Sequence, residues 1–221
     1  MKKAKVLLVC PNLKGIQDGK NRIQPSLGLM LIAQKLMDDG HIVKIYDAAL
    51  DGWNNRNVID PKNNIVMIGQ SNDNIEKVIS NFSPDIVAIS VIYSNLLESS
   101  HNIAKLVKKV KKNTKVILGG NHISSAVTDY KISLIDKNSK LPKVITDLED
   151  EHFDFAMIGE GEFSMVKLVN RLLNKEDISK IFNTLNVVKS YNSVGGTAPE
   201  SVAKMLQRFE SSLKEAQVGL E

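Results

Sequence analysis

The hydrophobic residues of this chain fall into short continuous runs, separated by longer segments of helical spacing. The runs with strand character are Lys5 to Cys10, His41 to Tyr46, Ile86 to Ile92, Val116 to Leu118 and Phe155 to Ile158. Continuous runs rich in Val and Ile are typical of strands that are buried on both faces of a parallel sheet. The pattern therefore predicts five buried strands.

Between these runs, hydrophobic residues recur every three or four positions, which is the period of an amphipathic helix. The predicted helices cover Leu27 to Asp39, Ser71 to Phe82, Asn95 to Lys112 and Phe163 to Leu173. Gly40 follows the first of them and suits its C-terminal stop. Because strands and helices alternate, each strand–helix–strand unit is expected to be right-handed, with parallel strands.

The predicted fold is α/β: a doubly wound parallel five-stranded sheet of flavodoxin-like or Rossmann-like order 2-1-3-4-5. In that order the ligand crevice lies at the carboxyl edge, between the first and third strands, and the loops after Cys10 and Ser90 line it. The polar segments Pro11 to Gln24 and Asp51 to Asn64 are predicted to be loops. The pattern leaves the structure of the short apolar run Ile65 to Ile68 open.

The C-terminal part of the chain divides into the end of a domain and a tail. Residues 1–189 are the predicted domain, with a broken helix and loop over Ile123 to Glu151 and a last short strand over Thr184 to Val188. Residues 190–221 are a predicted linker and helical appendage, with one apolar face formed by Val202, Met205, Leu206, Phe209 and Leu213. This helix could cap the domain or mediate self-association of two copies.

Composition and charge exclude several classes of protein. The net charge of +4 over 221 residues comes from lysines with few aromatic residues among them, so we expect no nucleic-acid binding. No apolar run approaches the roughly 20 residues of a membrane span, and the first strand is too short for a signal-peptide core, which predicts a cytoplasmic protein without membrane contact. The single cysteine, Cys10, rules out a disulfide framework.

The ends of the first and third strands lack the motifs of other α/β families. They read Cys10-Pro11 and Ser90-Val91, without the acidic residues of a phospho-acceptor domain. No Walker-type loop occurs, and no Gly-x-Gly-x-x-Gly follows the first strand. A lone Cys10 cannot hold an iron–sulfur cluster, so we expect it to pack at its strand end.

Small and polar residues gather where the strands end. Gly119-Gly120 suits either a tight turn or the close approach of a ligand to the backbone. The hydroxyl of Ser90 could satisfy a backbone group or donate to a ligand at the sheet edge. Glu160 and Glu162 start a helix, where carboxylates stabilise its dipole. His122 could be structural or could face the same edge.

Four sequence motifs together resemble the cobalamin-binding domain of the cobalamin-dependent radical SAM protein family. They are Pro25-Ser26-Leu27-Gly28-Leu29 with Gly40-His41, Pro84 to Ser90, Lys115 to Gly120 with His122, and Asp154 to Glu162 with its Gly-Glu-Gly-Glu turn. The combination is specific, although each piece is weak alone. The resemblance covers about Lys5 to Asn174.

The resemblance implies a corrinoid cofactor, cobalamin, whose nucleotide tail enters near Ser90 and Gly119-Gly120. The implied cofactor-binding residues are Pro11, Asn12, Ser90, Val91, Ile92, Tyr93, Ser94, Gly119, Gly120, His122, Gly159, Glu160, Gly161 and Glu162. The wider cobalamin fold has a cobalt-ligating His after its first strand, but Asn12 to Arg22 contains none. Metal ion binding is therefore expected through the corrinoid, with no protein metal ligand.

The chain also departs from the family's catalytic part. It has one cysteine, so it lacks the Cys-x-x-x-Cys-x-x-Cys cluster motif, and no catalytic residues are predicted. We expect a cobalamin-binding module that presents its corrinoid to a separate radical SAM or methyltransferase partner. The alternatives are a degenerate flavodoxin-like domain that serves protein assembly without a cofactor, and binding of another ligand with a nucleotide tail. The tail after Ser190 resembles the end of argininosuccinate lyases, without their catalytic residues.

Overall fold

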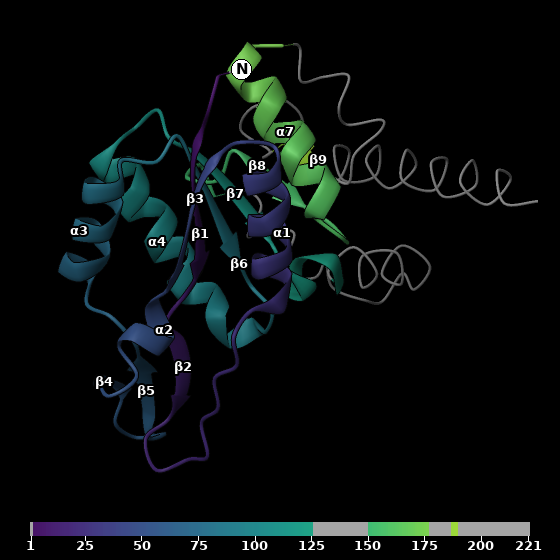
Figure 1. Cartoon of the computed structure of the whole chain (residues 1–221). Helices are drawn as coiled ribbons and strands as arrows, with labels where there is room; N and C mark the ends of the chain where they lie inside the picture. The colour runs from purple at the N-terminus through teal and green to yellow at the C-terminus, as the bar shows by residue number, and fades with distance from the viewer. Residues whose placement is uncertain (1, 126–149, 177–186, 190–221) are drawn as a thin grey trace, which may run out of the picture.

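The main sheet has the predicted parallel order. The computed structural model describes residues 2–125, 150–176 and 187–189 (Figure 1). In it, β3 (Ile42–Asp47), β1 (Lys5–Cys10), β6 (Ile86–Ser90), β7 (Lys115–Gly119) and β8 (Phe155–Met157) lie side by side and run parallel. In chain order of these five strands, this is the arrangement 2-1-3-4-5. A sixth strand, β9 (Val187–Lys189), pairs antiparallel with β8.

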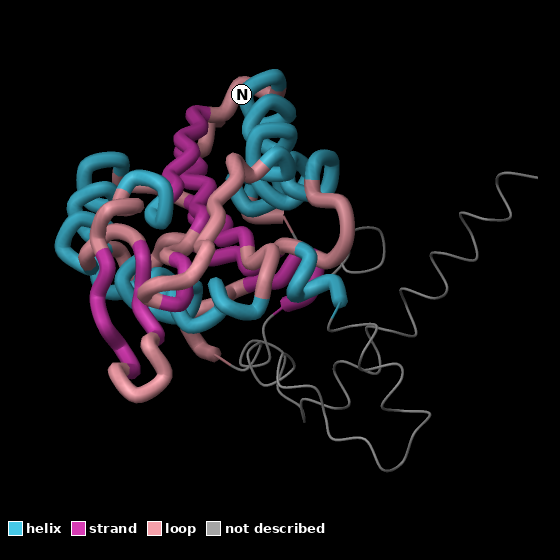
Figure 2. Tube along the Cα trace, turned by 90° about the horizontal axis from the view of Figure 1, so that it is seen from below, coloured by secondary structure: helices cyan, strands magenta, loops and turns pink. Residues whose placement is uncertain are grey.

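Helices cover both faces of this sheet, as expected for a doubly wound fold (Figures 1 and 2). On one face lie α3 (Asn72–Phe82) and α4 (Leu97–Val110), and on the other lie α1 (Leu27–Asp38) and α7 (Glu162–Asn174). The side chains of Ser26 and Ser71 cap α1 and α3 by accepting a hydrogen bond from the N–H three residues on, which satisfies a free donor of the first turn.

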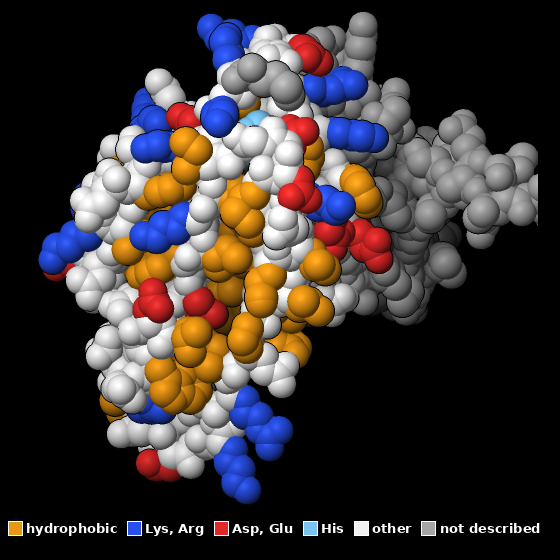
Figure 3. All heavy atoms as spheres, viewed as in Figure 1, with side chains coloured by type: hydrophobic (Ala, Val, Ile, Leu, Met, Phe, Trp, Pro, Cys, Tyr) orange, Lys and Arg blue, Asp and Glu red, His pale blue; other side chains and the backbone are white. Residues whose placement is uncertain are grey.

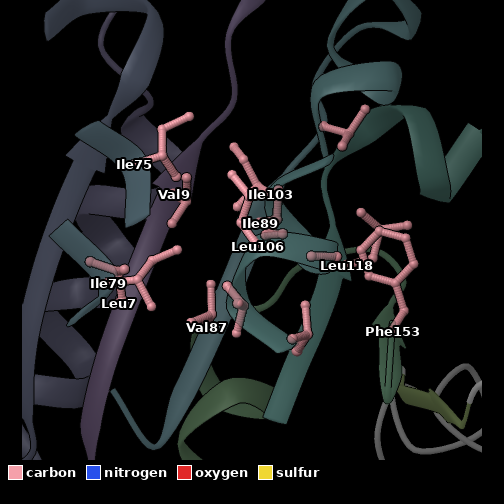
Figure 4. Close-up of a cluster of buried hydrophobic side chains, with 14 of the residues drawn as sticks. Leu7, Val9, Ile75, Ile79, Val87, Ile89, Ile103, Leu106, Leu118 and Phe153 are labelled. Carbon is pink, nitrogen blue, oxygen red and sulfur yellow. The ribbon is translucent and has the colours of Figure 1, made fainter. Parts of the chain in front are cut away.

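Two hydrophobic layers hold the helices to the sheet, because successive strand residues point to opposite faces. Leu7 and Val9 of β1 pack towards α3 and α4, together with Ile89 of β6 (Figure 4). Val6 and Leu8 point the other way, towards α1 and α7. Each fully buried side chain of this kind contributes about 1.5–3 kcal/mol relative to an exposed one. The continuous apolar runs of the sequence are explained by this burial on both faces.

A second, three-stranded antiparallel sheet lies beyond the carboxyl end of β1 (Figures 1 and 2). It contains β2 (Leu13–Ile16), β5 (Ile65–Ile68) and β4 (Arg56–Asp60), and the short helix α2 (Ala48–Asp51) precedes β4 and β5 in the chain. The prediction of loops over Pro11 to Gln24 and Asp51 to Asn64 was wrong where β2 and β4 form, and the residues around those two strands are turns and loops. Four of the five β4 residues are exposed, so that strand shows no hydrophobic alternation. β4 and β5 form a local antiparallel hairpin, whereas β2 pairs with β5 across about fifty residues of sequence, a contact that no local pattern reveals.

The element boundaries shift by a few residues from those expected. Strand β6 ends at Ser90, as predicted, although the apolar run continues to Ile92, and a short 3₁₀ turn, η1 (Ser94–Leu96), precedes α4. The prediction for Ile123 to Glu151 falls largely on residues 126–149, which lie outside the described residues, as does the tail from 190 to 221. The division at residue 189 stays a prediction. Within the described ranges, no helix has the length and apolarity that a bilayer span requires.

Asp154 ties three elements together at the amino edge of the sheet. Its carboxylate accepts hydrogen bonds from Lys108 Nζ of α4 at 2.6 Å, from Lys115 Nζ at 2.9 Å and from the Val116 N–H of β7 at 2.8 Å. Burial alone would raise the pKa of Asp154, but these hydrogen bonds outweigh it and hold the pKa below its usual value. The first residue of the Asp154 to Glu162 motif therefore has a structural role, at the sheet edge opposite the glycines.

Replacing Asp154 with Asn is expected to lower the free energy of unfolding by about 1.5–3 kcal/mol at pH 7, because charged hydrogen bonds are lost. A carboxyl whose folded pKa is depressed stabilises the fold above its unfolded pKa of about 4 and loses that effect as the pH falls further. Urea denaturation at pH 7, 5 and 3 should show the difference from wild type shrinking at pH 3. The matched control is Glu98→Gln, which removes an exposed ion pair with Lys14 and should cost less than about 1 kcal/mol. A deficit that is the same at every pH would contradict this account.

Candidate functional site

The residues predicted from the strand ends do meet at one edge. Ser90 and Gly119 are register partners in the last row of the β6–β7 ladder. β8, which carries the Gly159-Glu160-Gly161-Glu162 turn at its end, is the next strand along the sheet. The glycine pair, the serine and the acidic turn therefore come together at the carboxyl edge, where α/β sheets bind ligands.

A cavity of about 250 Å³ opens at this edge between the sheet and the helices α1 and α7, and we refer to it as the slot. Its lining includes the predicted residues Ser90, Gly119, Gly120, Gly159, Glu160, Gly161 and Glu162. The rest of the lining is Gly28, Leu29 and Ile32 of α1, Ala88, Ile89 and Ile117 of the strands, and Met157 and Met165. The slot is thus formed by glycines and small residues at its mouth and by apolar side chains from five elements.

The two glycines of the pair have different roles. Gly120 has a φ of +106°, and a Cβ added there would lie 2.5 Å from the Val91 carbonyl oxygen. Its missing side chain is therefore required by the chain itself. A Cβ added at Gly119 would meet only Met157, at 3.7 Å, an ordinary contact. The space beside Gly119 belongs to the slot, so this glycine is the one whose missing side chain leaves room for a ligand.

Backbone hydrogen bonds hold the loops around the slot in place. The Val91 N–H donates to the Gly119 carbonyl at 2.7 Å, and the His122 N–H donates to the Val91 carbonyl at 3.1 Å. The Ser124 hydroxyl donates to the Gly120 carbonyl at 3.3 Å and accepts from the Gly159 N–H at 2.8 Å. The loops after β6, β7 and β8 are thereby linked, so the slot is preformed in the free protein.

A second, more open cavity of about 620 Å³ lies at the same edge, lined by the loop after β6 and the residues after Gly120. Its lining is Ile92, Tyr93, Ser94, Asn95, Asn121, His122 and Ser125. The Nδ1 atom of His122 lies 3.2 Å from the Ser94 hydroxyl, and its buried Nε2 has no hydrogen-bond partner among the described residues. This cavity brings the predicted residues Ile92, Tyr93, Ser94 and His122 together, and it is rich in amide and hydroxyl groups.

Three of the predicted residues line neither cavity. Pro11 and Asn12 are buried, and Asn12 is fully occupied: its N–H donates to Ser99 Oγ at 3.0 Å, and its side-chain amide exchanges two hydrogen bonds with the backbone of Gln70. It fastens the small sheet to the end of β1. Val91 is also buried and contributes through its backbone. These residues support the site without lining its cavities.

Sequence reasoning missed the helical wall of the slot. This wall is formed by Leu29 and Ile32 of α1 and Met165 of α7, with Met157 at the end of β8. The one available signal was Gly28, which weakens the first turn of an otherwise favourable helix. A Cβ added there would meet no atom within 4 Å.

Cys10 is a neutral thiol at the end of β1. Burial, together with the nearby charge of Asp47, raises its pKa to about 12, although a hydrogen bond with Ser26 opposes the shift. A thiol that stays protonated at neutral pH is a poor metal ligand or nucleophile. Among the described residues, no group of three or more His, Cys, Asp or Glu side chains is arranged to hold a metal ion.

A doubly wound parallel sheet with a cavity at its carboxyl edge places the chain in the class of open α/β proteins, which bind ligands at that edge. The family whose sequence model matches this chain is the B12 binding domain, over residues 21–137. This match extends over more than half of the chain. The chain therefore belongs to the B12-binding domain family and is a cobalamin-binding module.

Two curated relatives are methyltransferases. The chain is 31% identical over 168 residues to cytidylyl-2-hydroxyethylphosphonate methyltransferase of Streptomyces wedmorensis, which covers 76% of this chain and 28% of that protein. It is 25% identical over 211 residues to an uncharacterized methyltransferase of Pyrococcus horikoshii, covering 95% of this chain and 37% of that protein. The chain thus spans about a third of the length of these relatives.

Among solved structures, the chain is similar to a cobalamin-binding protein from Desulfitobacterium hafniense. The two share 15% identity with a TM-score of 0.41, over 77% of this chain and 59% of that one. Similarity at this level is too low to bear on the assignment.

The two glycines should respond differently to the same substitution. Gly119→Val is expected to leave the protein folded but to weaken cobalamin binding at least about tenfold, because the side chain enters the slot. Gly120→Val should instead destabilise the fold, by about 1–3 kcal/mol from the positive φ alone and more from the clash with Val91. Thermal melts and cobalamin titrations of both variants measure this, with Gly119→Ala as the small-side-chain control. Full affinity in a folded Gly119→Val protein would remove the slot from the binding site.

Proposed function

We propose that this module binds cobalamin with the nucleotide tail in the slot and the corrin ring across the carboxyl edge, and presents it to a methyltransferase unit. The observation that carries this proposal is the preformed slot beside Gly119, whose mouth is kept open by glycines. A slot that narrow accepts one slender group rather than a whole cofactor, since pockets for drug-sized ligands measure about 300–1,000 Å³.

Each part of the edge has a task in this arrangement. The Ser90 hydroxyl can donate to the tail at the slot mouth, and the missing side chain of Gly119 lets the tail approach the backbone. The polar side chains of the second cavity, among them Tyr93, Ser94 and Asn121, can bond to the amide groups around a corrin ring. When bound, the cofactor supplies a cobalt centre that carries a methyl group.

The partner unit is proposed from three observations. The two curated relatives are methyltransferases about three times as long as this chain. An iron–sulfur cluster needs several cysteines, and this chain has only one. In the proposed arrangement, a radical SAM partner unit would therefore supply the cluster ligands. Hydrophobic side chains also gather over α1 on the face shown in Figure 3, where Leu27, Met30 and Leu31 are exposed. A surface of this kind favours contact with another protein unit.

Purified protein mixed with hydroxocobalamin and then desalted is expected to keep the cofactor, visible as corrin absorbance in the protein fraction. Gly119→Val, treated in the same way, should lose most of that absorbance while its circular dichroism stays that of the folded protein. A colourless wild-type protein that is folded would overturn the proposal and favour a domain that serves assembly without a cofactor.

The cobalt of the bound cofactor is expected to have no nitrogen ligand below the ring. The segment from Asn12 to Arg22 contains no His, His41 lies at the start of β3, and His101 and His152 both contact Asp150. His122 is at the carboxyl edge, but its Nε2 is buried. Electron paramagnetic resonance of the Co(II) form should therefore show no nitrogen superhyperfine splitting.

Two outcomes of that measurement would contradict the arrangement. Splitting that disappears in His122→Ala would show that this imidazole is the cobalt ligand. Splitting that persists in His122→Ala and in His101→Ala would show that the base of the tail stays on the cobalt instead of entering the slot.

A further inference from the structure

The slot changes character from its mouth to its floor. Ser90 and Gly119 form the outer row, and the register places Ala88 and Ile117 two residues behind them, on the same face of their strands. At about 3.3 Å per residue, this second row lies about 6–7 Å deeper. Leu29 of α1 and Met165 of α7 close the floor from the helix side, and all four floor side chains are buried.

No polar side chain reaches that floor from the residues described around the slot. The polar side chains in the lining are Ser90, Glu160 and Glu162, and all three lie at the mouth. The backbone N–H and C=O groups of β6 and β7 are engaged in the parallel ladders that these strands form with each other and with β1 and β8. A group that enters to full depth therefore meets aliphatic carbon and the methionine sulfurs, which make favourable contacts with aromatic rings.

This distribution discriminates between the bases that a cobamide tail can carry. The outer edge of 5,6-dimethylbenzimidazole presents two methyl groups, which suit an apolar floor. Adenine presents an exocyclic amine and ring nitrogens, which lose their water on entry and find no partner there. Leaving a buried donor or acceptor unpaired weakens binding by about tenfold or more.

We propose that the slot floor formed by Leu29, Ala88, Ile117 and Met165 selects cobamides with a benzimidazole base over those with a purine base. This inference rests on the proposed function, because it requires the tail to enter the slot. It adds a specificity to that function: the module distinguishes between cofactors that share the same corrin ring and the same cobalt chemistry.

The test is to titrate the cofactor-free protein with cobalamin, with adeninylcobamide and with cobinamide, which lacks the nucleotide, following binding by calorimetry. Cobalamin is expected to bind about tenfold or more tightly than adeninylcobamide, and more tightly than cobinamide. Ile32→Gln places an amide on the slot wall beside the base, so it should reduce the preference for cobalamin at least about threefold. Leu31→Gln is the matched control, on the exposed side of the same helix, and should leave the preference unchanged.

The outcomes separate this inference from the proposed function. Equal affinity of the wild-type protein for cobalamin and adeninylcobamide would overturn the base selection and leave cobamide binding intact. Cobinamide that binds as tightly as cobalamin would show that the tail does not use the slot, which also overturns it. Failure to bind any of the three would overturn the proposed function itself. If Ile32→Gln does not fold, the wild-type comparison decides alone.

Discussion

The close contact between Gly120 and the backbone of Val91 is the constraint on which the carboxyl edge depends. A side chain at position 120 would overlap the Val91 carbonyl, and the positive φ of Gly120 turns the chain back over the end of β6. That turn lets the His122 N–H reach Val91 and lets Ser124 bond to the loop after β8. Because three loops are linked in this way, the slot exists before any ligand arrives, and binding needs little ordering of the protein.

The main sheet could be predicted from the sequence because each of its strands is buried on both faces. Burial makes Lys5–Cys10 and Ile86–Ser90 nearly continuous hydrophobic runs, and helices with a clear apolar face separate them. The small sheet could not be predicted in the same way. Its strand Arg56–Asp60 is exposed, and Leu13–Ile16 pairs with Ile65–Ile68 from about fifty residues away, beside the hydrogen bonds between Asn12 and the backbone of Gln70. Such tertiary contacts leave no periodic trace.

The motif residues turned out to divide between binding and support. Ser90 and Gly119 line the slot, whereas Asp154 fastens β8 at the opposite edge of the sheet, and Asn12 and Val91 hold loops. A motif records both kinds of residue without distinguishing them. The slot walls formed by α1 and α7 could not be distinguished from the hydrophobic core in the sequence. A side chain that faces a cavity and one that faces another helix follow the same 3.6-residue period.

Among the described residues, the inner end of the slot is closed, and under the proposed binding mode this has a kinetic consequence. Its floor residues are buried, and at the far end the Asn170 side chain of α7 donates to Asp39 at the end of α1 at 2.7 Å, which holds the two helices together. If the tail enters the slot as proposed, it leaves through the mouth that its own corrin ring covers, so ring and tail would withdraw in one movement. Release is then slow compared with capture. On the proposed binding mode, such a module would keep its cofactor bound rather than exchange it in each cycle.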